Sequence, residues 1–265
     1  MKWTKEKIIQ EVFSLERKQK RRPTKHDYSN LYTLSKKHFG SWSNMMKYAG
    51  YNVKSLQKPT IPDLNSNSFH YFLGLLYTDG HVVFDKLNQT YKIMLFTSYV
   101  EEKNMIVRLI KNLFNYKASI RLKKYGFNKR INHEIYISSK KLCGFLIKEI
   151  KFPAGAKSLT VRLPNIVLKD PSKAWHFIRG VFDGDGSIIN TEKAYFLKIC
   201  SGSKRFINDL GKLMVKLGFK GGIIRQEREK LWVWKINKKK DLKRFYQLAY
   251  KDCNGYYYQR KKLKW

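Results

Sequence analysis

The sequence predicts an α+β protein in which one unit of helix, hairpin, helix, hairpin and helix occurs twice after a small helical module. From residue 69 onward, stretches with the apolar spacing of helices alternate with short runs that have the two-residue alternation of strands. The order and approximate lengths of these elements then recur, which indicates an internal duplication. The first 52 residues, in contrast, carry only helical patterns.

The N-terminal residues 1–52 are expected to form a small helix-turn-helix-like module that contacts DNA. Its second helix is expected to end at Gly40, and Ser41 can cap the third. The basic turn after the first helix includes Arg21 and Arg22, which are candidate DNA contacts. A helical packing extension with a solvated basic loop is the alternative.

A linker and two repeats are expected to follow this module. Residues 53–68 are rich in proline, asparagine and serine and are expected to be the linker. The two repeats are expected at residues 69–168 and 169–265. The first has expected helices at 69–79, 101–114 and 140–150 and strands at 82–84, 91–97, 118–123 and 134–138; the second has helices at 174–183, 204–217 and 238–250 and strands at 187–190, 195–201, 222–226 and 231–236.

The charge balance points to a polyanionic partner. The chain has 55 Lys and Arg against 20 Asp and Glu, a formal net charge of +35, and nucleic acid is the obvious partner for a protein this basic. No apolar stretch of about 18 residues or signal peptide is present, so we expect no membrane association. Cys143, Cys200 and Cys253 are odd in number and widely spaced, as expected for reduced thiols in a cytoplasmic or organellar compartment.

Each repeat opens with a helix that ends in the same pattern, FLGLLYTDG at residues 72–80 and IRGVFDGDG at residues 178–186. Glycine inside a helix costs about 1 kcal/mol relative to alanine, so Gly74 and Gly180 call for a packing reason. A glycine on one face of each helix lets two helix backbones approach closely. The sequence therefore predicts that the two motif helices pack against each other about a pseudo-two-fold axis.

Asp79 and Asp185 end these two helices and are expected to meet at the same end of the pair. A carboxylate is disfavoured by the negative end of a helix dipole, and two neighbouring carboxylates repel each other. Divalent cations would reverse both penalties, and ligation by oxygen alone suits Mg²⁺ or Mn²⁺. A polar helix-to-hairpin turn would explain either motif alone, but not two at matched positions.

The paired motifs resemble the LAGLIDADG homing endonucleases, in the form that carries both motifs on one chain. This resemblance covers residues 69–265 and implies an αββαββα fold in each half, with saddle-shaped antiparallel sheets. It also implies an intron-encoded monomer that cleaves both strands of double-stranded DNA with divalent metal ions and leaves short 3′ overhangs. Residues 1–52 resemble a repeat found attached to homing endonucleases, through Arg-Pro-Thr and Phe-Gly-Ser-Trp-Ser.

The resemblance assigns roles to residues of the two motifs. Asp79 and Asp185 match the metal-binding acids, and Thr78 and Gly184 match positions whose carbonyl oxygens can help to bind metal. Tyr77 departs from the aspartate often found at its position, whereas Asp183 retains it; this position is not the essential acid.

A basic residue near each active site is also typical of the family. Lys157 and Lys261 fit this role, since 104 residues separate them and 106 separate the two acids (261 − 157 and 185 − 79). A lysine there could stabilise charge on the phosphate or orient the attacking water. Arg260 and Lys262 compete with Lys261 for the role.

Sequence readout is expected from outward-facing residues of the hairpins, because a β-ribbon fits the major groove. Ile120 and Leu122 are expected to face the core, with Ile224 and Gln226 as their counterparts. The expected DNA contacts are Val83, Asp85, Arg121, Lys123, Ile189, Thr191, Lys198, Arg225 and Glu227. Differences between the two halves imply a non-palindromic target, and a merely solvated sheet face is the alternative.

Two functions compete with the nuclease. Some proteins of this family help a host intron RNA to fold, and a catalytically inactive DNA-binding protein could retain the same fold. Loss of either Asp79 or Asp185 would favour the inactive protein, and both are present.

Overall fold

The computed structural model describes residues 3–53, 57–125, 130–155, 157–192 and 194–265. The chain divides into two compact units, Met1–Gln57 and Lys58–Trp265. Each unit has its own cluster of buried apolar side chains. Among the described residues, no helix combines the length and the apolar character needed to cross a membrane.

The smaller unit consists of three helices, α1 (Lys5–Gln19), α2 (Ser29–Phe39) and α3 (Trp42–Tyr48). Gly40 ends α2 in a left-handed conformation with φ of 73°, and the Ser41 hydroxyl caps α3, as the sequence predicts. One apolar face of each helix contributes to the small core, whose buried members are Ile8, Val12, Leu31, Leu34, Met45 and Met46.

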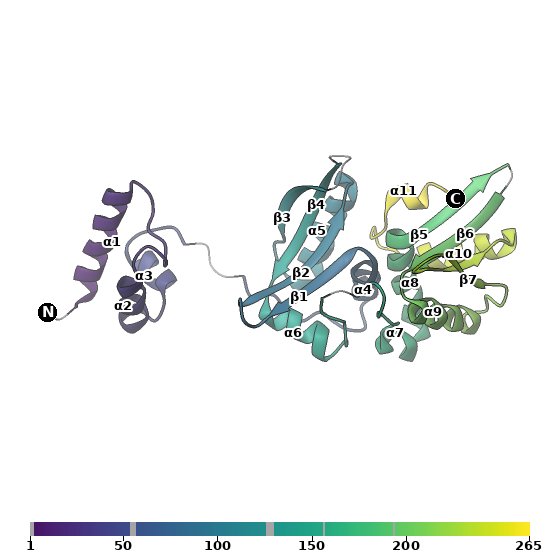
Figure 1. Cartoon of the computed structure of the whole chain (residues 1–265), viewed down its shortest axis with the longest axis horizontal. Helices are drawn as coiled ribbons and strands as arrows, with labels where there is room; N and C mark the ends of the chain where they lie inside the picture. Colours follow the sequence, from purple (N-terminus) through teal and green to yellow (C-terminus); the bar gives the residue numbers. More distant parts are fainter. Residues whose placement is uncertain (1–2, 54–56, 126–129, 156, 193) are drawn as a thin grey trace. The chain divides into compact units, whose positions relative to one another are not determined.

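The larger unit contains the two repeats, and Figure 1 shows each as a sheet with its own helices. The first repeat comprises α4 (Asn67–Asp79), β1 (Gly80–Asp85), β2 (Thr90–Thr97), α5 (Val100–Phe114), β3 (Ser119–Tyr125), β4 (Arg130–Ser138) and α6 (Lys140–Lys148). The second comprises α8 (Pro171–Asp185), β5 (Gly186–Thr191), β6 (Ala194–Ser201), α9 (Lys204–Lys216), β7 (Ile223–Arg228), β8 (Leu231–Ile236) and α10 (Lys239–Tyr250). The α+β duplication predicted from the sequence is therefore confirmed.

Both sheets are antiparallel and have matching strand orders, β1-β2-β4-β3 and β5-β6-β8-β7. Helices α4 and α8 lie side by side between the two sheets (Figure 1). The Ser66 hydroxyl caps the N-terminus of α4, and the Asp170 carboxylate caps that of α8. A single apolar core extends through both repeats, so the two halves form one folded unit.

The edge strands differ from the sequence expectation in burial. Ile120 pairs with Ile135, which is fully buried on the helix-covered face, so Ile120 lies on the expected side of the sheet. However, Ile120 and Leu122 are 46% and 62% exposed, and their counterpart Ile224 is 38% exposed. These residues lie on β3 and β7, each an edge strand of its sheet, where only one side of the strand has a neighbour.

Two short helices and part of the linker also extend the expected architecture. Helices α7 (Asn165–Lys169) and α11 (Gln259–Lys262) are too short to produce a recognisable apolar period. The expected linker reaches residue 68, yet its portion from residue 58 onward packs on the larger unit. There, the Thr60 amide donates to the Phe114 carbonyl at 2.9 Å, and Leu64 contacts the core.

Candidate active site

The two motif helices meet through their glycines. A Cβ atom added to Gly74 would lie 2.3 Å from the Phe177 carbonyl oxygen and 2.7 Å from the Gly180 Cα. One added to Gly180 would lie 2.4 Å from the Tyr71 carbonyl oxygen. Any side chain at either position would therefore push the backbones of α4 and α8 apart, as the motif spacing predicts.

This close approach brings Asp79 and Asp185 to the same end of the seam. Asp79 is the last residue of α4 and Asp185 is the last residue of α8, and each is followed at once by the first strand of its repeat. A Cβ atom added to Gly184 would lie 2.1 Å from the Thr78 hydroxyl and 3.0 Å from an Asp79 carboxylate oxygen. The Asp79 side chain therefore lies against the end of α8.

The surroundings of both acids disfavour their charged forms. The pKa of Asp79 is raised to about 7, mainly by burial and then by the negative charges of Asp185 and Glu102. Two cations, Lys261 and Lys157, oppose this increase. Burial also raises the pKa of Asp185, against the effect of the same two lysines. Burial thus penalises the charged form of both acids, and the two lysines offset only part of that penalty.

The two acids open into different pockets. Asp185 lines a cavity of about 280 Å³, whose other described lining residues are Tyr77, Thr78, Gly80, His81, Gly155, Lys157, Ser158, Val161, Ser201 and Gly202. Asp79 lines a cavity of about 240 Å³ together with Phe96, Thr97, Ser98, Tyr99, Glu102, Asn132, Gly184 and Arg260. Each cavity therefore combines one motif acid with a cation, Lys157 in the first and Arg260 in the second.

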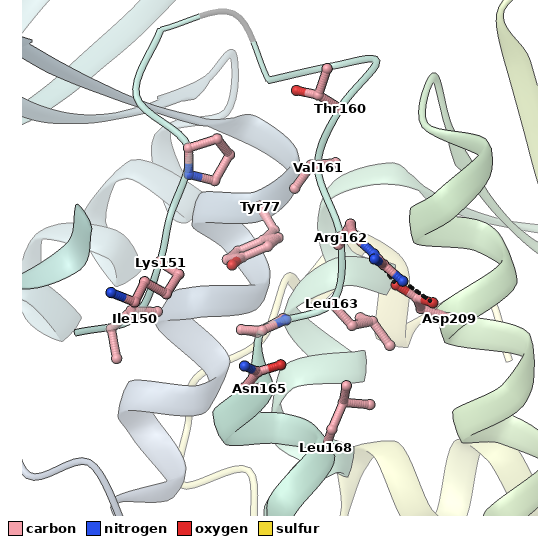
Figure 2. Close-up of a pocket in the computed structure, with 12 residues that line it drawn as sticks. Tyr77, Ile150, Lys151, Thr160, Val161, Arg162, Leu163, Asn165, Leu168 and Asp209 are labelled. Atoms are coloured by element: carbon pink, nitrogen blue, oxygen red, sulfur yellow. Dashed lines mark hydrogen bonds and ion pairs between the residues drawn. The ribbon is translucent and has the colours of Figure 1, made fainter. Parts of the chain in front are cut away.

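A larger cavity of about 440 Å³ lies beside the connection between the repeats, where Arg162 and Asp209 form an ion pair at 3.1 Å (Figure 2). It is lined largely by apolar residues and contains neither motif acid. Tyr77 and Val161 line both this cavity and the Asp185 pocket.

The two candidate lysines contact backbone carbonyls of the motifs. The Lys157 ammonium donates to the carbonyl oxygens of Tyr77 at 2.5 Å and Thr78 at 3.1 Å. Burial lowers the pKa of Lys157 to about 8, although Asp185 and Asp79 favour its charged form. The Lys261 ammonium donates to the Gly186 carbonyl, and burial likewise lowers its pKa.

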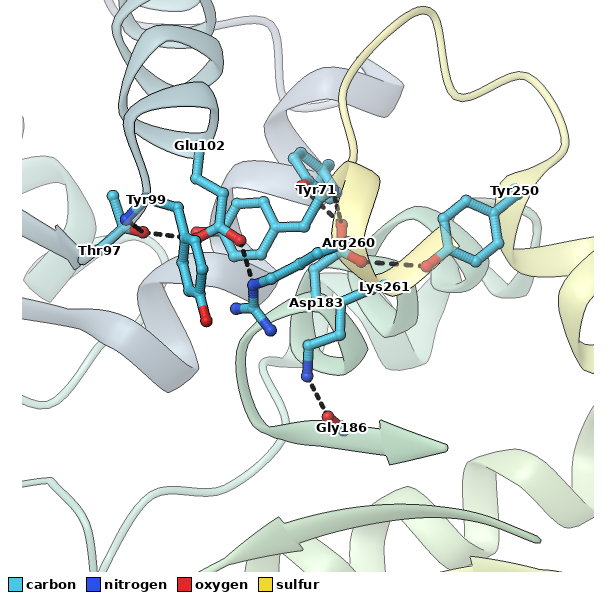
Figure 3. Close-up of polar contacts among 10 residues, drawn as sticks. Tyr71, Thr97, Tyr99, Glu102, Asp183, Gly186, Tyr250, Arg260 and Lys261 are labelled. Carbon is cyan, nitrogen blue, oxygen red and sulfur yellow. Dashed lines mark hydrogen bonds and ion pairs between the residues drawn. The ribbon is translucent and has the colours of Figure 1, made fainter. Parts of the chain in front are cut away.

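The residue two positions before each acid anchors the segment that carries the corresponding lysine. Asp183 is fully buried and accepts hydrogen bonds from the Tyr71 hydroxyl at 2.8 Å, the Tyr250 hydroxyl at 3.1 Å and the Tyr258 amide at 2.9 Å. Figure 3 shows this carboxylate between Tyr71 and Tyr250, close to the segment that bears Arg260 and Lys261. Asp183 therefore holds the C-terminal segment against α4 and α8.

Tyr77, at the matching position of the first motif, works by packing instead. Its ring makes edge contacts with Phe152 and Phe177, with ring centroids 5.0 Å and 5.5 Å apart. Phe152 belongs to the segment that leads to Lys157. The departure from aspartate at this position thus replaces a hydrogen-bonded anchor with an aromatic one.

The candidate DNA contacts on the sheets share the faces that point away from the helices. Val82 and Ile188 point into the core, so Val83 and Ile189, which follow them, point outward. By strand register the same outward faces hold Asp85, Arg121, Lys123, Thr191, Lys198 and Arg225, while Glu227 lies in an irregularity of β7 and contacts two of them. The sequence missed Lys92 and Lys235, which pair with Val83 and Lys198.

Several of these polar side chains already have protein partners. Glu227 forms ion pairs with Lys198 at 2.7 Å and Arg225 at 2.9 Å. Lys123 pairs with Glu134 at 3.0 Å. Asp85 accepts hydrogen bonds from Asn88 in the turn between β1 and β2. The charge available for phosphate contacts is therefore smaller than the sequence suggests.

In the smaller unit, the two arginines of the basic turn are also engaged. Arg21 forms an ion pair with Asp27 at 2.6 Å, and its side chain is 53% exposed. The Arg22 guanidinium donates to the Asn52 carbonyl at 3.1 Å and lies over the Tyr51 ring. Both arginines stabilise the turn through these contacts.

Glu102 and Arg260 both line the Asp79 pocket; the sequence reasoning missed Glu102 and left Arg260 as one of three candidates. Glu102 is 4% exposed and lies on the buried stripe of α5 with Met105, Ile106 and Leu109. The sequence signal that could have revealed Glu102 is a carboxylate at a position where the helical period of α5 otherwise places apolar residues. The pairing of Glu102 with Arg260 could not be predicted, because 158 residues separate them in the chain.

Comparisons with known proteins agree with this geometry. The sequence model of the LAGLIDADG-like domain matches residues 173–249, and that of the homing endonuclease associated repeat matches residues 3–52. The structure of the homing endonuclease I-DmoI in complex with DNA and Mn covers 71% of this chain and 98% of its own, with a TM-score of 0.53 and 20% identity. The structure of I-WcaI bound to its DNA recognition sequence covers 77% of this chain and 87% of its own, with a TM-score of 0.54 and 17% identity.

Curated relatives are more similar in sequence over shorter segments. A probable cell division protein WhiA from Clostridium beijerinckii is 27% identical over 161 residues, which cover 58% of this chain. The chain spans about half the length of this relative. The chain thus has the duplicated LAGLIDADG fold with its paired motifs, and it is similar to the LAGLIDADG-like domain over residues 173–249 and to the homing endonuclease associated repeat over residues 3–52.

Proposed function

We propose that the protein is a site-specific, metal-dependent DNA endonuclease that acts as a monomer. It hydrolyses phosphodiester bonds in both strands of a long, non-palindromic target and leaves short 3′ overhangs. The observation that carries the proposal is the meeting of Asp79 and Asp185 at the helix seam, where burial raises the pKa of both carboxyl groups. A structural role would not require two such costly groups at matched positions.

The oxygen donors of the site fit a divalent cation. Burial disfavours the charged form of both carboxylates, which a bound cation would favour, and Mg²⁺ is commonly held by one or two carboxylates with water and substrate phosphate. Among the described residues no cluster of three or more His, Cys, Asp or Glu side chains could hold a metal, so water, phosphate or backbone oxygens would complete the coordination. The carbonyls of Thr78 and Gly184 are the backbone candidates.

The protein groups have separate tasks in this proposal. When bound, Mg²⁺ or Mn²⁺ supplies an activated water and stabilises the charge on the leaving oxygen. Asp79 and Asp185 hold the cations, one acid for the pocket that faces each strand. Lys157 holds positive charge in the Asp185 pocket, and Lys261, which donates to the Gly186 carbonyl, also offsets the charge of the acids. Two related pockets on one chain thereby cleave two strands.

Recognition rests on the outward sheet faces and the N-terminal repeat. Basic and polar residues on alternate strand positions suit contacts with base edges and phosphates. The N-terminal repeat adds contacts that flank the cleavage site, through a turn whose geometry Arg21 and Arg22 maintain. Together these surfaces read a longer sequence than either sheet alone.

Selection of cleaved sequences from a randomised duplex library in Mg²⁺ tests the proposal. The purified Asp185→Asn variant is then compared with wild type on the selected target, with binding measured by gel shift in Ca²⁺. We expect Asp185→Asn to bind DNA but not to make double-strand breaks. Asp209→Asn, which removes an acid paired with Arg162 outside the site, is the control and is expected to retain cleavage. Unchanged cleavage by Asp185→Asn would exclude the role assigned to this acid.

A catalytically inactive nucleic-acid-binding protein is the second candidate, because the curated relatives are named as probable cell division proteins. Gel shifts with duplex DNA and with structured RNA distinguish the partners. Specific binding of the selected DNA without cleavage in either Mg²⁺ or Mn²⁺ would favour this candidate. Preferential binding of RNA would favour a role with a host intron transcript.

A further inference from the structure

The Asp79 pocket contains a buried carboxylate that the Asp185 pocket lacks. Glu102 is the third residue of α5, and Phe206 is the third residue of the matching helix α9. Both side chains are buried, at 4% and 2% exposure. The duplication has therefore placed a charged group in one half where the other half has an apolar ring. Glu102 lines the Asp79 pocket, and Phe206 lines neither active-site pocket.

Glu102 is held in a single orientation by two short contacts. Its carboxylate accepts a hydrogen bond from the Thr97 hydroxyl at 2.5 Å and another from Arg260 Nε at 2.5 Å. A buried carboxylate is expensive unless it is paired and hydrogen-bonded, so these contacts account for its presence. Figure 3 shows Glu102 and Arg260 facing each other from α5 and from the C-terminal segment.

Arg260 lines the Asp79 pocket and keeps donors beyond its contact with Glu102. Only Nε is used by Glu102, and the two terminal nitrogens donate no hydrogen bond to any residue that the structure describes. The guanidinium lies over the Tyr99 ring at 4.6 Å and the Tyr258 ring at 5.6 Å, and the side chain is 35% exposed. A guanidinium that is fixed through Nε, keeps its terminal nitrogens as donors and lines a cavity with Asp79 suits a phosphate.

Lys261, the neighbour of Arg260, does not occupy this position. Its side chain is 7% exposed, donates to the Gly186 carbonyl and is absent from the described lining of the Asp79 pocket. Lys157, its counterpart by spacing, does line the Asp185 pocket. The pocket-facing cation is therefore a lysine in one half and an arginine in the other.

We propose that Arg260 is a catalytic residue of the Asp79 pocket that contacts the scissile phosphate, and that Glu102 is its positioning residue. The inference rests on the proposed nuclease function and adds that the two strands are cut at chemically different sites. Loss of Arg260 is then expected to impair one strand, and loss of Lys157 the other.

Strand-resolved cleavage tests this inference. A selected target duplex carries a different fluorescent label on each strand, and single-turnover rates are measured for both strands in Mg²⁺. We expect Arg260→Gln to slow one strand by about tenfold or more and to change the other by less than about twofold. Lys157→Gln is expected to slow the opposite strand. Arg260→Lys should recover part of the loss, because it restores the charge without the planar donors.

Glu102→Gln tests the positioning role. It is expected to slow the same strand as Arg260→Gln, since the amide holds the guanidinium less firmly. Glu101→Gln, exposed on the adjacent position of α5, and Arg205→Gln, exposed on α9, are the matched controls and should leave both rates unchanged. Because Glu102 is buried, its substitution could also destabilise the fold, so the thermal unfolding of each variant is measured as well. The comparison of wild type with Arg260→Gln decides the inference, because Arg260 is more exposed.

The possible failures are distinguishable. Wild-type protein that binds but cleaves neither strand contradicts the proposed nuclease function itself. Wild-type cleavage with an unaffected Arg260→Gln variant, or with both strands slowed equally, overturns the inference while the nuclease function stands. Slowing of the same strand by Arg260→Gln and Lys157→Gln would also overturn it.

Discussion

Substitution of alanine for Gly74 offers a sharp test of the helix seam. The new Cβ would lie 2.3 Å from the Phe177 carbonyl oxygen, whereas ordinary contact begins at 3.4 Å, so the backbones must separate by about 1.1 Å (3.4 − 2.3). The obstructing atoms all belong to the backbone of α8 and cannot rotate away. Gly144, within α6, is the matched control because a Cβ there meets nothing within 4 Å.

The two substitutions should change the free energy of unfolding in opposite directions. Overpacking costs about 1–3 kcal/mol or more, and a gap of up to about 1 Å along the rest of the seam forfeits a quarter to a half of each dispersion contact. Against this, alanine gains about 1 kcal/mol in helix propensity. We therefore expect Gly74→Ala to lower the free energy of unfolding by about 2 kcal/mol or more. Gly144→Ala should instead raise it by up to about 1 kcal/mol.

Thermal unfolding followed by circular dichroism measures both effects. In a unit of this size each kcal/mol corresponds to about 2–4 °C, so Gly74→Ala should lower the melting temperature by about 4–8 °C or more. The double variant Gly74→Ala/Gly180→Ala should cost less than the sum of the single variants, because one separation relieves both clashes. A Gly74→Ala protein as stable as Gly144→Ala would refute the close helix approach.

Three further predictions concern the acids and the N-terminal repeat. The pKa of Asp79 is raised from 3.8 to about 7, so its stability contribution is fully present below about pH 3.8 and is lost as the pH rises through 7. In EDTA at pH 8, urea titrations should therefore find Asp79→Asn more stable than wild type by up to about 4 kcal/mol, at 1.36 kcal/mol per pKa unit. Saturating Mg²⁺ should remove this difference. Asp183→Leu should lower the free energy of unfolding by about 3 kcal/mol or more, because it leaves two buried hydroxyls and one amide without a hydrogen-bond partner at about 1–3 kcal/mol each. Asp183→Asn should lower it by less, and equal losses in denaturant titrations would contradict the anchoring role. Deletion of residues 1–57 should leave a folded unit that still cleaves but binds the long target more weakly in gel shifts, and loss of folding would contradict the separation into two units.

The sequence was sufficient for features that depend on local pattern. Helical and strand periodicities revealed the repeated elements, and the matched positions of Gly74 with Gly180 and Asp79 with Asp185 predicted the seam. Both predictions of architecture follow from short-range rules, in which a residue's neighbours within one or two turns decide its conformation. The same rules predicted which strand positions face away from the helices, because the side-chain period of a strand is two.

The tertiary structure alone decided which side chains meet at the site. Glu102 and Arg260 are 158 residues apart, and Asp183 contacts Tyr71 from 112 residues away. No local period relates such positions, since they become neighbours only when the two helices dock and the C-terminal segment folds back across them. Burial, which sets the pKa of Asp79 and turns Lys261 toward the Gly186 carbonyl, likewise depends on packing that no single segment contains.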